Sequence, residues 1–300
     1  MAAKKRRRRN KSLKLIITVV VVLAAIIAGA FGINEIQKTS VQSGSTVEDG
    51  EAMIHFIDVG QGDAILITMS EGNVLIDAGT NSSEDELKAY LDNLKITEIE
   101  YAVFTHPHED HIGGADMVLE NYDVNNILIP DYTYTSATYN RMIDCIEKED
   151  AKLHLAKPDM SFKVDDMEFF VLAPISQTPK ETNNSSVVIK AAYGSTTFMF
   201  TGDAETASEE EIIARYTKES LKCDLLKVGH HGSDTSTSDE FLALVAPKYA
   251  VMQVGAGNSY DHPCQSTLLK LEKAGVEYYR TDLHGDVVFV TDGKTLTKKD

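Results

Sequence analysis

From residue 52 onward, hydrophobic positions follow two alternating patterns. Short runs rich in Val, Ile, Leu and Phe are bounded by Gly, Asp, Asn or Pro, which is typical of β-strands. Between them, segments such as 82–94 carry leucines at helical spacing after a capping-type serine. The predicted strands are 52–59, 63–69, 73–79, 99–106, 125–130, 152–156, 168–174, 185–193, 196–203, 223–232, 248–255, 276–281 and 286–292. The predicted helices are 82–94, 115–122, 136–150, 204–220, 238–245 and 264–275.

Hairpin-like pairs of strands and strand–helix alternation occur in both halves of this region. The order favours an α/β fold in which two mixed sheets face each other, with helices outside, over one doubly wound parallel sheet. The glycine-containing stretch DVGQGD lies between two predicted strands. It is therefore not a dinucleotide or phosphate loop, which would open a helix.

The N-terminal region has a different pattern. Residues 15–33 contain no charged residue, and as a helix they would span roughly 28 Å, about the thickness of a bilayer core. The basic segment 1–14 should remain cytoplasmic, which places the rest outside the cell. We predict a transmembrane anchor at 15–33, a polar linker at 34–51 and one folded domain at 52–300. The alternative is a cleaved signal peptide and a secreted domain, because Ala28-Gly29-Ala30 resembles a cleavage site.

Charge is divided along the chain in the same way. The net charge is −17, but eight of the 29 basic residues lie in segment 1–14, which holds no acid. The remainder therefore has 21 basic against 46 acidic residues, a net charge of −25. Such a domain is not expected to bind nucleic acid tightly without sequence preference. It can still act on a phosphodiester if bound cations supply positive charge locally.

Three histidines and two acids gather in the stretch FTHPHEDHIGG, at the end of the strand predicted to end at residue 106. Alternate side chains of an extended segment point the same way, so two of the imidazoles should face one cation. The acid and the third histidine follow where the chain turns. Imidazole and carboxylate together suit zinc, and also manganese or iron. We predict that this stretch binds metal through His106, His108, Asp110 and His111.

One loop cannot complete a site for two metal ions, so other strand ends should contribute. The run FMFTGD ends in Asp203, and LLKVGHHGS contains His230 and His231. The carboxylate of Asp203 is suited to bridge two cations about 3.5–4 Å apart. Of the two adjacent histidines, one should be a ligand and the other a supporting or substrate contact. Strand alternation does not decide which, because the chain is expected to leave the strand at Gly229.

The sequence resembles metallo-β-lactamase-fold hydrolases, and within them the ComEC-type competence proteins. The matching pieces run from about residue 53 to 290, in the order FIDVGQGDAILI, VLIDAG, THPHEDHIGG, NNSSVVI, FMFTGD, LLKVGHHGS and NSYDHP. The resemblance implies an αββα sandwich that holds its metals at one edge. Many relatives have a further histidine ligand where Asn183 and Asn184 stand here. An amide oxygen is a weak zinc ligand, so manganese is the alternative to zinc at that position.

Several other residues are expected to support the site. Metal-bound imidazoles usually donate their second N–H to a carboxylate or carbonyl. We assign this orienting role to Asp58, Asp63 and Asp77, which begin or end strands beneath the histidine loop. His262 is a candidate to contact the substrate or to protonate the leaving oxygen. The family usually has Gly at the position of Asp261, so the local turn there departs from the pattern.

The expected function is hydrolysis by a hydroxide that bridges two divalent cations, with zinc favoured and manganese the alternative. Asp110 and Asp203 would position this nucleophile. The acidic domain, its export and the family branch favour a phosphodiester in a nucleic acid, a nucleotide or a phosphorylated surface polymer. A second possibility is a carboxyl-type hydrolase acting on a β-lactam or lactone. A third is a non-catalytic binding module at the cell surface.

Overall fold

Two β-sheets form the two central layers of the domain. The computed structural model describes residues 47–299. One sheet, sheet A, contains β1 (Ala52–Phe56), β2 (Ile65–Met69), β3 (Gly72–Ile76), β4 (Glu98–Val103), β5 (Asp123–Pro130), β6 (Lys152–Ala156), β14 (Val287–Thr291) and β15 (Leu296–Lys298). The other, sheet B, contains β7 (Ser161–Val164), β8 (Met167–Ala173), β9 (Val188–Tyr193), β10 (Thr196–Phe200), β11 (Leu225–Lys227), β12 (Tyr249–Met252) and β13 (Glu277–Arg280).

Both sheets mix parallel and antiparallel pairs. Sheet A has the order β15-β14-β1-β2-β3-β4-β5-β6, and sheet B has the order β13-β12-β11-β10-β9-β8-β7. The pairs from β3 to β6 and from β10 to β13 are parallel, whereas β1–β2 and β8–β9 are antiparallel. The two mixed sheets predicted from the hydrophobic pattern are therefore confirmed. The short strands β7 and β15 were not predicted, because three or four residues are too few to show an alternation.

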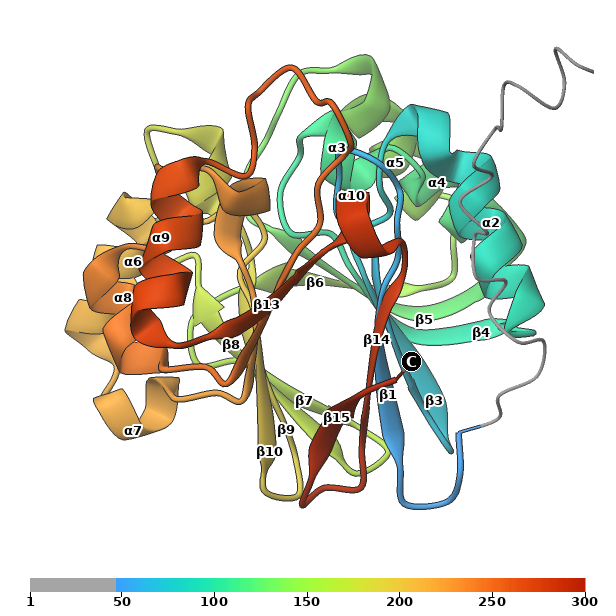
Figure 1. Cartoon of the computed structure of the whole chain (residues 1–300). Helices are drawn as coiled ribbons and strands as arrows, with labels where there is room; N and C mark the ends of the chain where they lie inside the picture. The colour runs from blue at the N-terminus through green and yellow to red at the C-terminus, as the bar shows by residue number, and fades with distance from the viewer. Residues whose placement is uncertain (1–46, 300) are drawn as a thin grey trace, which may run out of the picture. The chain divides into compact units, whose positions relative to one another are not determined.

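Helices cover the outer face of each sheet (Figure 1). The α-helices are α2 (Glu84–Asn93), α3 (Glu109–Ile112), α4 (Ala115–Asn121), α5 (Ala137–Ile146), α6 (Thr206–Arg215), α7 (Lys218–Leu221), α8 (Asp239–Val245), α9 (Gln265–Ala274) and α10 (Thr281–His284). The 3₁₀ turns are η1 (Asn81–Ser83), η2 (Thr182–Ser185) and η3 (Gly229–Gly232). Helices α2, α4 and α5 lie against sheet A, and α6, α8 and α9 lie against sheet B.

The prediction of a single helix at 204–220 is wrong, because the structure has two helices in this range. The helical segment is interrupted at Tyr216, whose extended backbone (φ −110°, ψ 151°) ends α6. Thr217 then caps α7 by accepting a hydrogen bond from the backbone N–H of Ser220. Thr is a strong capping residue, and this local cap starts a new helix instead of continuing the old one.

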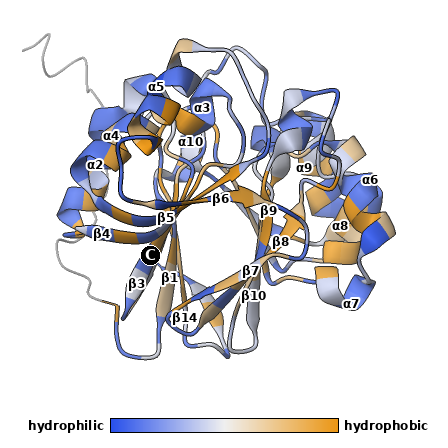
Figure 2. Cartoon of the chain, turned by 180° about the vertical axis from the view of Figure 1, so that it is seen from behind, coloured by the Kyte–Doolittle hydropathy of each residue, from blue (hydrophilic) through white to orange (hydrophobic). Residues whose placement is uncertain are grey.

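Apolar side chains fill the space between the sheets. Figure 2 shows hydrophobic strands inside and hydrophilic helix faces outside. Phe56 of sheet A and Phe200 of sheet B are both fully buried, and their ring centroids lie 6.5 Å apart. Complete burial of one such side chain stabilises the fold by about 1.5–3 kcal/mol. A second core packs sheet B against its helices and includes Leu226, Phe241 and Leu271. These two cores hold the strand ends in place around the site.

Some predictions concern residues that the structure does not describe. The basic segment 1–14, the anchor at 15–33 and most of the linker at 34–51 lie outside residues 47–299. Within those described residues, no helix combines the length and the apolar character needed to cross a bilayer.

Candidate metal centre

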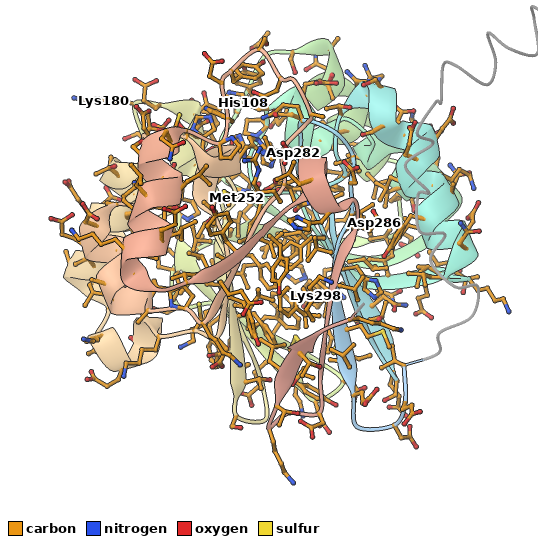
Figure 3. All side chains as sticks on the ribbon, viewed as in Figure 1. His108, Lys180, Met252, Asp282, Asp286 and Lys298 are labelled. Carbon is orange, nitrogen blue, oxygen red and sulfur yellow. The ribbon has the colours of Figure 1, made fainter. Side chains whose placement is uncertain are left out.

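The predicted ligands come from three strand ends that meet at one edge of the two sheets. Strand β4 of sheet A leads into the loop that carries His106 and His108 and then into α3. In sheet B, β10 leads to Asp203 and β11 leads to η3, which contains His230 and His231. Figure 3 shows His108 at this edge, beside the loops that connect strands to helices.

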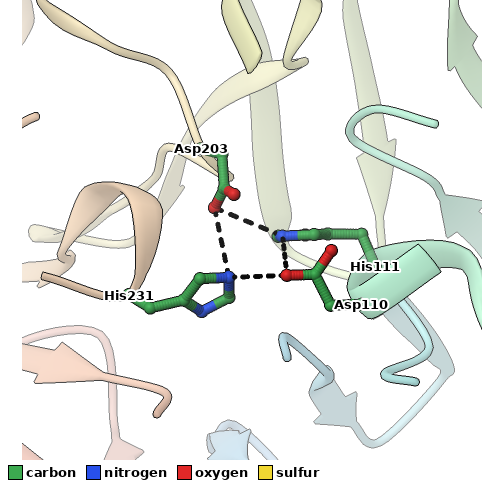
Figure 4. A group of neighbouring side chains, drawn as sticks. All are labelled: Asp110, His111, Asp203 and His231. Atoms are coloured by element: carbon green, nitrogen blue, oxygen red, sulfur yellow. Dashed lines mark hydrogen bonds and ion pairs between the residues drawn. The ribbon is translucent and has the colours of Figure 1, made fainter. Parts of the chain in front are cut away.

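Four side chains form what we call the primary cluster: Asp110, His111, Asp203 and His231 (Figure 4). His111 Nε2 lies 3.2 Å from Asp203 Oδ1, and His231 Nε2 lies 3.2 Å from Asp110 Oδ2. One ligand atom from each residue falls within 4.8 Å of all the others. This spacing is close to that of ligands that share one cation about 2 Å away.

His111 is oriented from behind by a carboxylate. Its Nδ1–H donates to Asp77 Oδ2 at 2.7 Å, and Asp77 also accepts hydrogen bonds from the backbone and hydroxyl of Thr105. Burial alone would lower the pKa of His111, but Asp203 and Asp77 outweigh it and raise that pKa well above its ordinary value. The imidazole therefore points Nε2 at the cluster, as expected of a histidine that binds a cation.

His231 is oriented by a backbone carbonyl. Its Nδ1–H donates to the carbonyl oxygen of Gln253 at 2.8 Å, and Asp63 Oδ1 lies 3.3 Å from the same nitrogen. Burial lowers the pKa of His231, but the carboxylates of Asp203 and Asp63 prevail and raise it to about 10. Without a cation, the carboxylates thus retain a proton on this imidazole.

The donor set fits a divalent cation. His111 Nε2 and Asp203 Oδ1 are fully enclosed, lie 3.2 Å apart and make no hydrogen bond to a residue outside the cluster. Buried polar atoms are costly when their contacts are incomplete, and a shared cation would coordinate both of these atoms, which otherwise have mainly each other. Burial would raise the pKa of Asp203, yet His111 and His231 hold it well below its ordinary value. Two imidazole nitrogens and two carboxylates suit zinc, manganese or iron.

A second set of residues, which we call the secondary group, lies beside the first: His106, His108, Asn183 and His230. His106 Nε2 is 3.0 Å from His108 Nδ1 and 3.8 Å from Asp203 Oδ2. His230 Nε2 is also 3.8 Å from Asp203 Oδ2. Asp203 therefore lies between the two sets, with Oδ1 nearer to the primary cluster and Oδ2 nearer to the secondary group.

In the secondary group, the pKa values of two histidines are lowered, whereas those of the primary cluster's histidines are raised. Burial lowers the pKa of His106 well below its ordinary value and lowers that of His108. Both imidazoles therefore stay neutral and can offer a lone pair without losing a proton. His230 is turned partly aside, because its Nδ1 lies 3.1 Å from the hydroxyl of Thr235 and 3.4 Å from Glu205 Oε1.

Asn183 and Asn184 reach the site from η2. Asn183 Nδ2 donates to Glu205 Oε1 at 3.1 Å, and its buried Oδ1 makes no hydrogen bond. Asn184 Oδ1 instead accepts from the backbone N–H groups of Glu205 and Ser208, which ties η2 to the start of α6. Of the two amides, only Asn183 lines the cleft, and its Oδ1 is the one that makes no hydrogen bond.

The cluster opens into a cleft with a volume of about 530 Å³. His262 lines the cleft, with its ring centroid 5.3 Å from that of His230 and its buried Nδ1 free of hydrogen bonds. Tyr260 stacks on His262 and is 65% exposed at the rim. The cleft is lined by Gln61, Thr80, His108, Glu109, Asp110, Asn183, Asp203, His230, His231, Tyr260 and His262.

Close backbone packing explains the glycines near the ligands. A Cβ on Gly113 would lie 2.1 Å from the backbone of Thr80, and a Cβ on Gly62 would lie 2.4 Å from the carbonyl oxygen of Asp110. Both approaches are possible only for glycine. They press the histidine loop against the segments that follow β1 and β3, which carry Asp63 and Asp77.

The supporting carboxylates divide into two kinds. Asp63 and Asp77 lie beside His111, with Asp63 Oδ2 3.9 Å from His111 Nδ1. Asp58 is outside this cluster and accepts a hydrogen bond from the backbone N–H of Gly60 within its own loop. Asp58 and Asp63 belong to the same DVGQGD loop, but only Asp63 points toward the cluster.

Three residues near the site were not singled out from the sequence. Lys227 is fully buried with its Nζ 2.6 Å from Asp63 Oδ2. Glu205 holds Asn183, and Gln253 bridges the sheets by donating to the carbonyls of Ile57 and Ala64. The only sequence signal for Lys227 is a charge at a position that shares the strand face of apolar Leu225.

Two facing mixed sheets with outer helices and a His/Asp cluster at their strand ends define a metal-dependent hydrolase fold. The chain belongs to the metallo-β-lactamase superfamily, whose family model matches residues 57–255. The resemblance found from the sequence motifs is thereby confirmed.

Similar curated proteins belong to the ComEC-like group. ComE operon protein 3 of Bacillus subtilis is 30% identical over 257 residues, 80% of this chain and 33% of that protein. Competence protein ComA of Neisseria gonorrhoeae is 28% identical over 81% of this chain and 33% of that protein. Recombination protein 2 of Haemophilus influenzae is 30% identical over 77% of this chain and 28% of that protein. The chain spans about a third of the length of these relatives.

Solved structures share the fold at low identity. The metallo-β-lactamase fold protein YhfI from Bacillus subtilis matches with a TM-score of 0.55 and 13% identity, over 80% of this chain and 100% of that chain. CmlA, a diiron β-hydroxylase from Streptomyces venezuelae, matches with a TM-score of 0.54 and 11% identity, over 85% of this chain and 55% of that chain. At these identities the likeness shows the fold alone.

Proposed function

We propose that the chain is an exported, membrane-anchored hydrolase that uses two divalent cations to cleave phosphodiester bonds. The observation that carries the proposal is the primary cluster, in which His111 Nε2 and Asp203 Oδ1 are enclosed 3.2 Å apart while Asp110, Asp203 and His231 line an open cleft. In a cluster built only for stability, such enclosed atoms would be expected to have further hydrogen bonds of their own.

The cations would be held unequally. Asp110, His111, Asp203 and His231 would hold one, and His106, His108 and Asp203 would hold the other, with Asn183 and His230 beside them. When bound, the cations would lower the pKa of water and neutralise the negative charge that develops during the reaction. We propose zinc as the metal, with manganese as the alternative because an amide oxygen takes the place of an imidazole.

The chain's own residues have separate tasks. Asp110 and Asp203 orient the attacking water, because their carboxylates face the cleft from opposite sheets. His262 lines the cleft beside His230, with the two ring centroids 5.3 Å apart. We propose that His262 donates a proton to the leaving oxygen.

The names of similar proteins support a phosphodiester substrate, and the lining of the cleft limits how such a substrate would bind. The similar proteins are named for competence and recombination, processes in which DNA is handled. None of the described residues that line the cleft is lysine or arginine, so the cations alone would meet the phosphate charge. This arrangement suits a nucleotide, a transiently bound nucleic acid or a phosphorylated surface polymer, and not tight non-specific binding of nucleic acid.

The proposed location follows from segments 1–14 and 15–33 of the sequence. A basic segment followed by an apolar span would leave the domain on the outside of the cell membrane. Protease added to intact cells should then degrade the domain. Complete protection of the domain, with an extracellular control protein digested, would refute the topology.

A paired hydrolysis assay tests the activity. The full-length chain, purified in detergent and supplied with zinc or manganese, would be offered bis-p-nitrophenyl phosphate, labelled single-stranded and double-stranded DNA, and nitrocefin. We expect turnover of the phosphodiesters and no turnover in the Asp203→Asn variant. Cleavage of nitrocefin alone would favour a carboxyl-type hydrolase. A chain that binds no metal and cleaves none of them would be a binding module.

A further inference from the structure

Lys227 is the last residue of β11 and is completely enclosed by the protein. Leu225, on the same face of the strand, packs in the core between the sheets. Lysine is almost never fully buried unless its charge is paired. Its position between the sheets, directly before the turn that carries His231, therefore calls for an explanation.

The partner of Lys227 belongs to the opposite sheet. Its Nζ lies 2.6 Å from Asp63 Oδ2 and donates to the carbonyl oxygen of Val228 at 2.9 Å. Asp63 lies in the loop between β1 and β2 of sheet A, whereas Lys227 ends a strand of sheet B. The ion pair thus crosses the gap between the sheets at the edge where the cluster forms.

Asp63 contacts the primary cluster from both sides. Its backbone N–H donates to the carbonyl oxygen of Asp110 at 3.1 Å. Its side-chain oxygens lie 3.3 Å from His231 Nδ1 and 3.9 Å from His111 Nδ1. A displacement of Asp63 would therefore move or reorient residues that come from sheet A and from sheet B.

We propose that Lys227 is a positioning residue for the metal centre, which it sets through Asp63. The ammonium holds the Asp63 carboxylate at a fixed point between His111 and His231, and so keeps the two halves of the primary cluster in register. The inference rests on the proposed metal centre but not on the nature of the substrate. Outer partners of metal-binding histidines commonly change cation affinity by 10–100-fold.

The rival explanation is that Lys227 only neutralises a buried carboxylate and has no effect on cation binding. A double-mutant cycle separates the two, because a residue that acts through Asp63 loses its effect when Asp63 is changed. The variants are Lys227→Met, Asp63→Asn and the combination of both. The matched control is Lys190→Met, a half-buried lysine on the outer face of the same sheet, whose Nζ donates to the carbonyl of Ser220.

The measurement is titration of the full-length, metal-free chain in detergent with Co²⁺, followed by visible absorption. Lys227→Met should lower Co²⁺ affinity by about 10–100-fold and alter the absorption spectrum, which reports the ligand geometry. In the Asp63→Asn background the same change should alter affinity by less than about twofold. Lys190→Met should match the unmodified chain, and thermal unfolding of each metal-free variant monitors the fold.

Two results would overturn the proposal if the Lys227→Met variant folds. One is a folded Lys227→Met variant with unchanged Co²⁺ affinity and spectrum. The other is an equal loss of affinity on changing Lys227 in both backgrounds. If Lys227→Met alone does not fold, the neutral pair decides: the double variant should bind Co²⁺ as Asp63→Asn does and at least about tenfold more weakly than the unmodified chain. Wild-type affinity in the double variant refutes the role.

These outcomes remain distinct from those of the proposed function. Failure to hydrolyse any phosphodiester would refute the substrate class while leaving the Co²⁺ comparison intact. A chain that binds no Co²⁺ would refute the metal centre, and with it both proposals.

Discussion

The primary cluster and the secondary group share Asp203 but are built differently. In the primary cluster, His111 and His231 are fully enclosed, and each is fixed from behind by an aspartate or a backbone carbonyl. In the secondary group, His108 and His230 border the cleft and contact other imidazoles or exposed polar groups. The first is enclosed and rich in carboxylate, and the second is more open and rich in imidazole.

This contrast bears on how each set would hold a cation. Carboxylates raise the pKa of His111 and of His231, so a cation must displace protons but gains strong electrostatic attraction. Burial lowers the pKa of His106 and His108, so those nitrogens are available without proton release. We expect the primary cluster to bind the tighter cation, because its charge and its supporting contacts are the greater.

The largest effect should come from the shared residue. Asp203→Asn replaces the carboxylate between both sets with a neutral amide of the same shape. Hydrolysis should fall by on the order of a thousandfold or more, and the cation content should drop below two per chain. Activity assays and metal analysis measure both, with circular dichroism as the control for folding. Near-normal turnover in this variant would remove the basis for a two-cation mechanism.

The two sets should respond differently when each loses a histidine. His111→Ala should weaken the tighter binding step, whereas His108→Ala should weaken the other step and abolish activity but leave one tightly held cation. Chelator competition followed by metal analysis distinguishes the steps. Both variants are expected to weaken the affected step by about a hundredfold. Identical binding curves for the two variants would mean that the primary cluster and the secondary group bind cations equally well.

The supporting carboxylate of His111 should have an intermediate effect. Asp77→Asn keeps the shape but weakens the acceptor of the His111 Nδ1–H. Affinity for the tighter cation should fall by about 10–100-fold, while the weaker step stays within about twofold. Zinc titration against a competing chelator measures the two steps. A change in the weaker step alone would assign Asp77 to the other set.

The smallest effect should be a gain. Asn183→His places an imidazole at a residue that lines the cleft and whose Oδ1 makes no hydrogen bond, and should raise zinc affinity of the weaker step by about tenfold. Asn184→His is the control, because Asn184 Oδ1 is already occupied by backbone N–H groups of α6. Equal effects of both substitutions would show that Asn183 has no privileged position.

Much of the site was predictable because the motif is local. The loop that carries His106, His108, Asp110 and His111 follows one strand, and its geometry depends on residues close in sequence. Asp77 follows the same logic, since it ends the parallel strand next to β4. These predictions needed only the direction of strands and the way side chains alternate along them.

Other features depended on contacts that strand alternation does not describe. His230 and His231 both adopt left-handed backbone angles (φ 48° and 52°), so the alternation of β11 stops before it reaches them. Of the two acids in the DVGQGD loop, Asp63 turns inward and Asp58 does not, because Asp63 meets Lys227 of the other sheet. Neither result follows from residue types along one strand.

The sequence by itself determined most of the strands and helices in their order, the two facing sheets, the residues available to bind cations and the family. Those properties arise from short-range periodicity and from motifs within single loops. Only the tertiary structure decided which histidine of the pair joins Asp110, which carboxylate supports it and that Lys227 joins the two sheets beneath them. These are contacts between residues as much as 164 positions apart, such as Lys227 and Asp63, and they exist only once both sheets have packed on a common core.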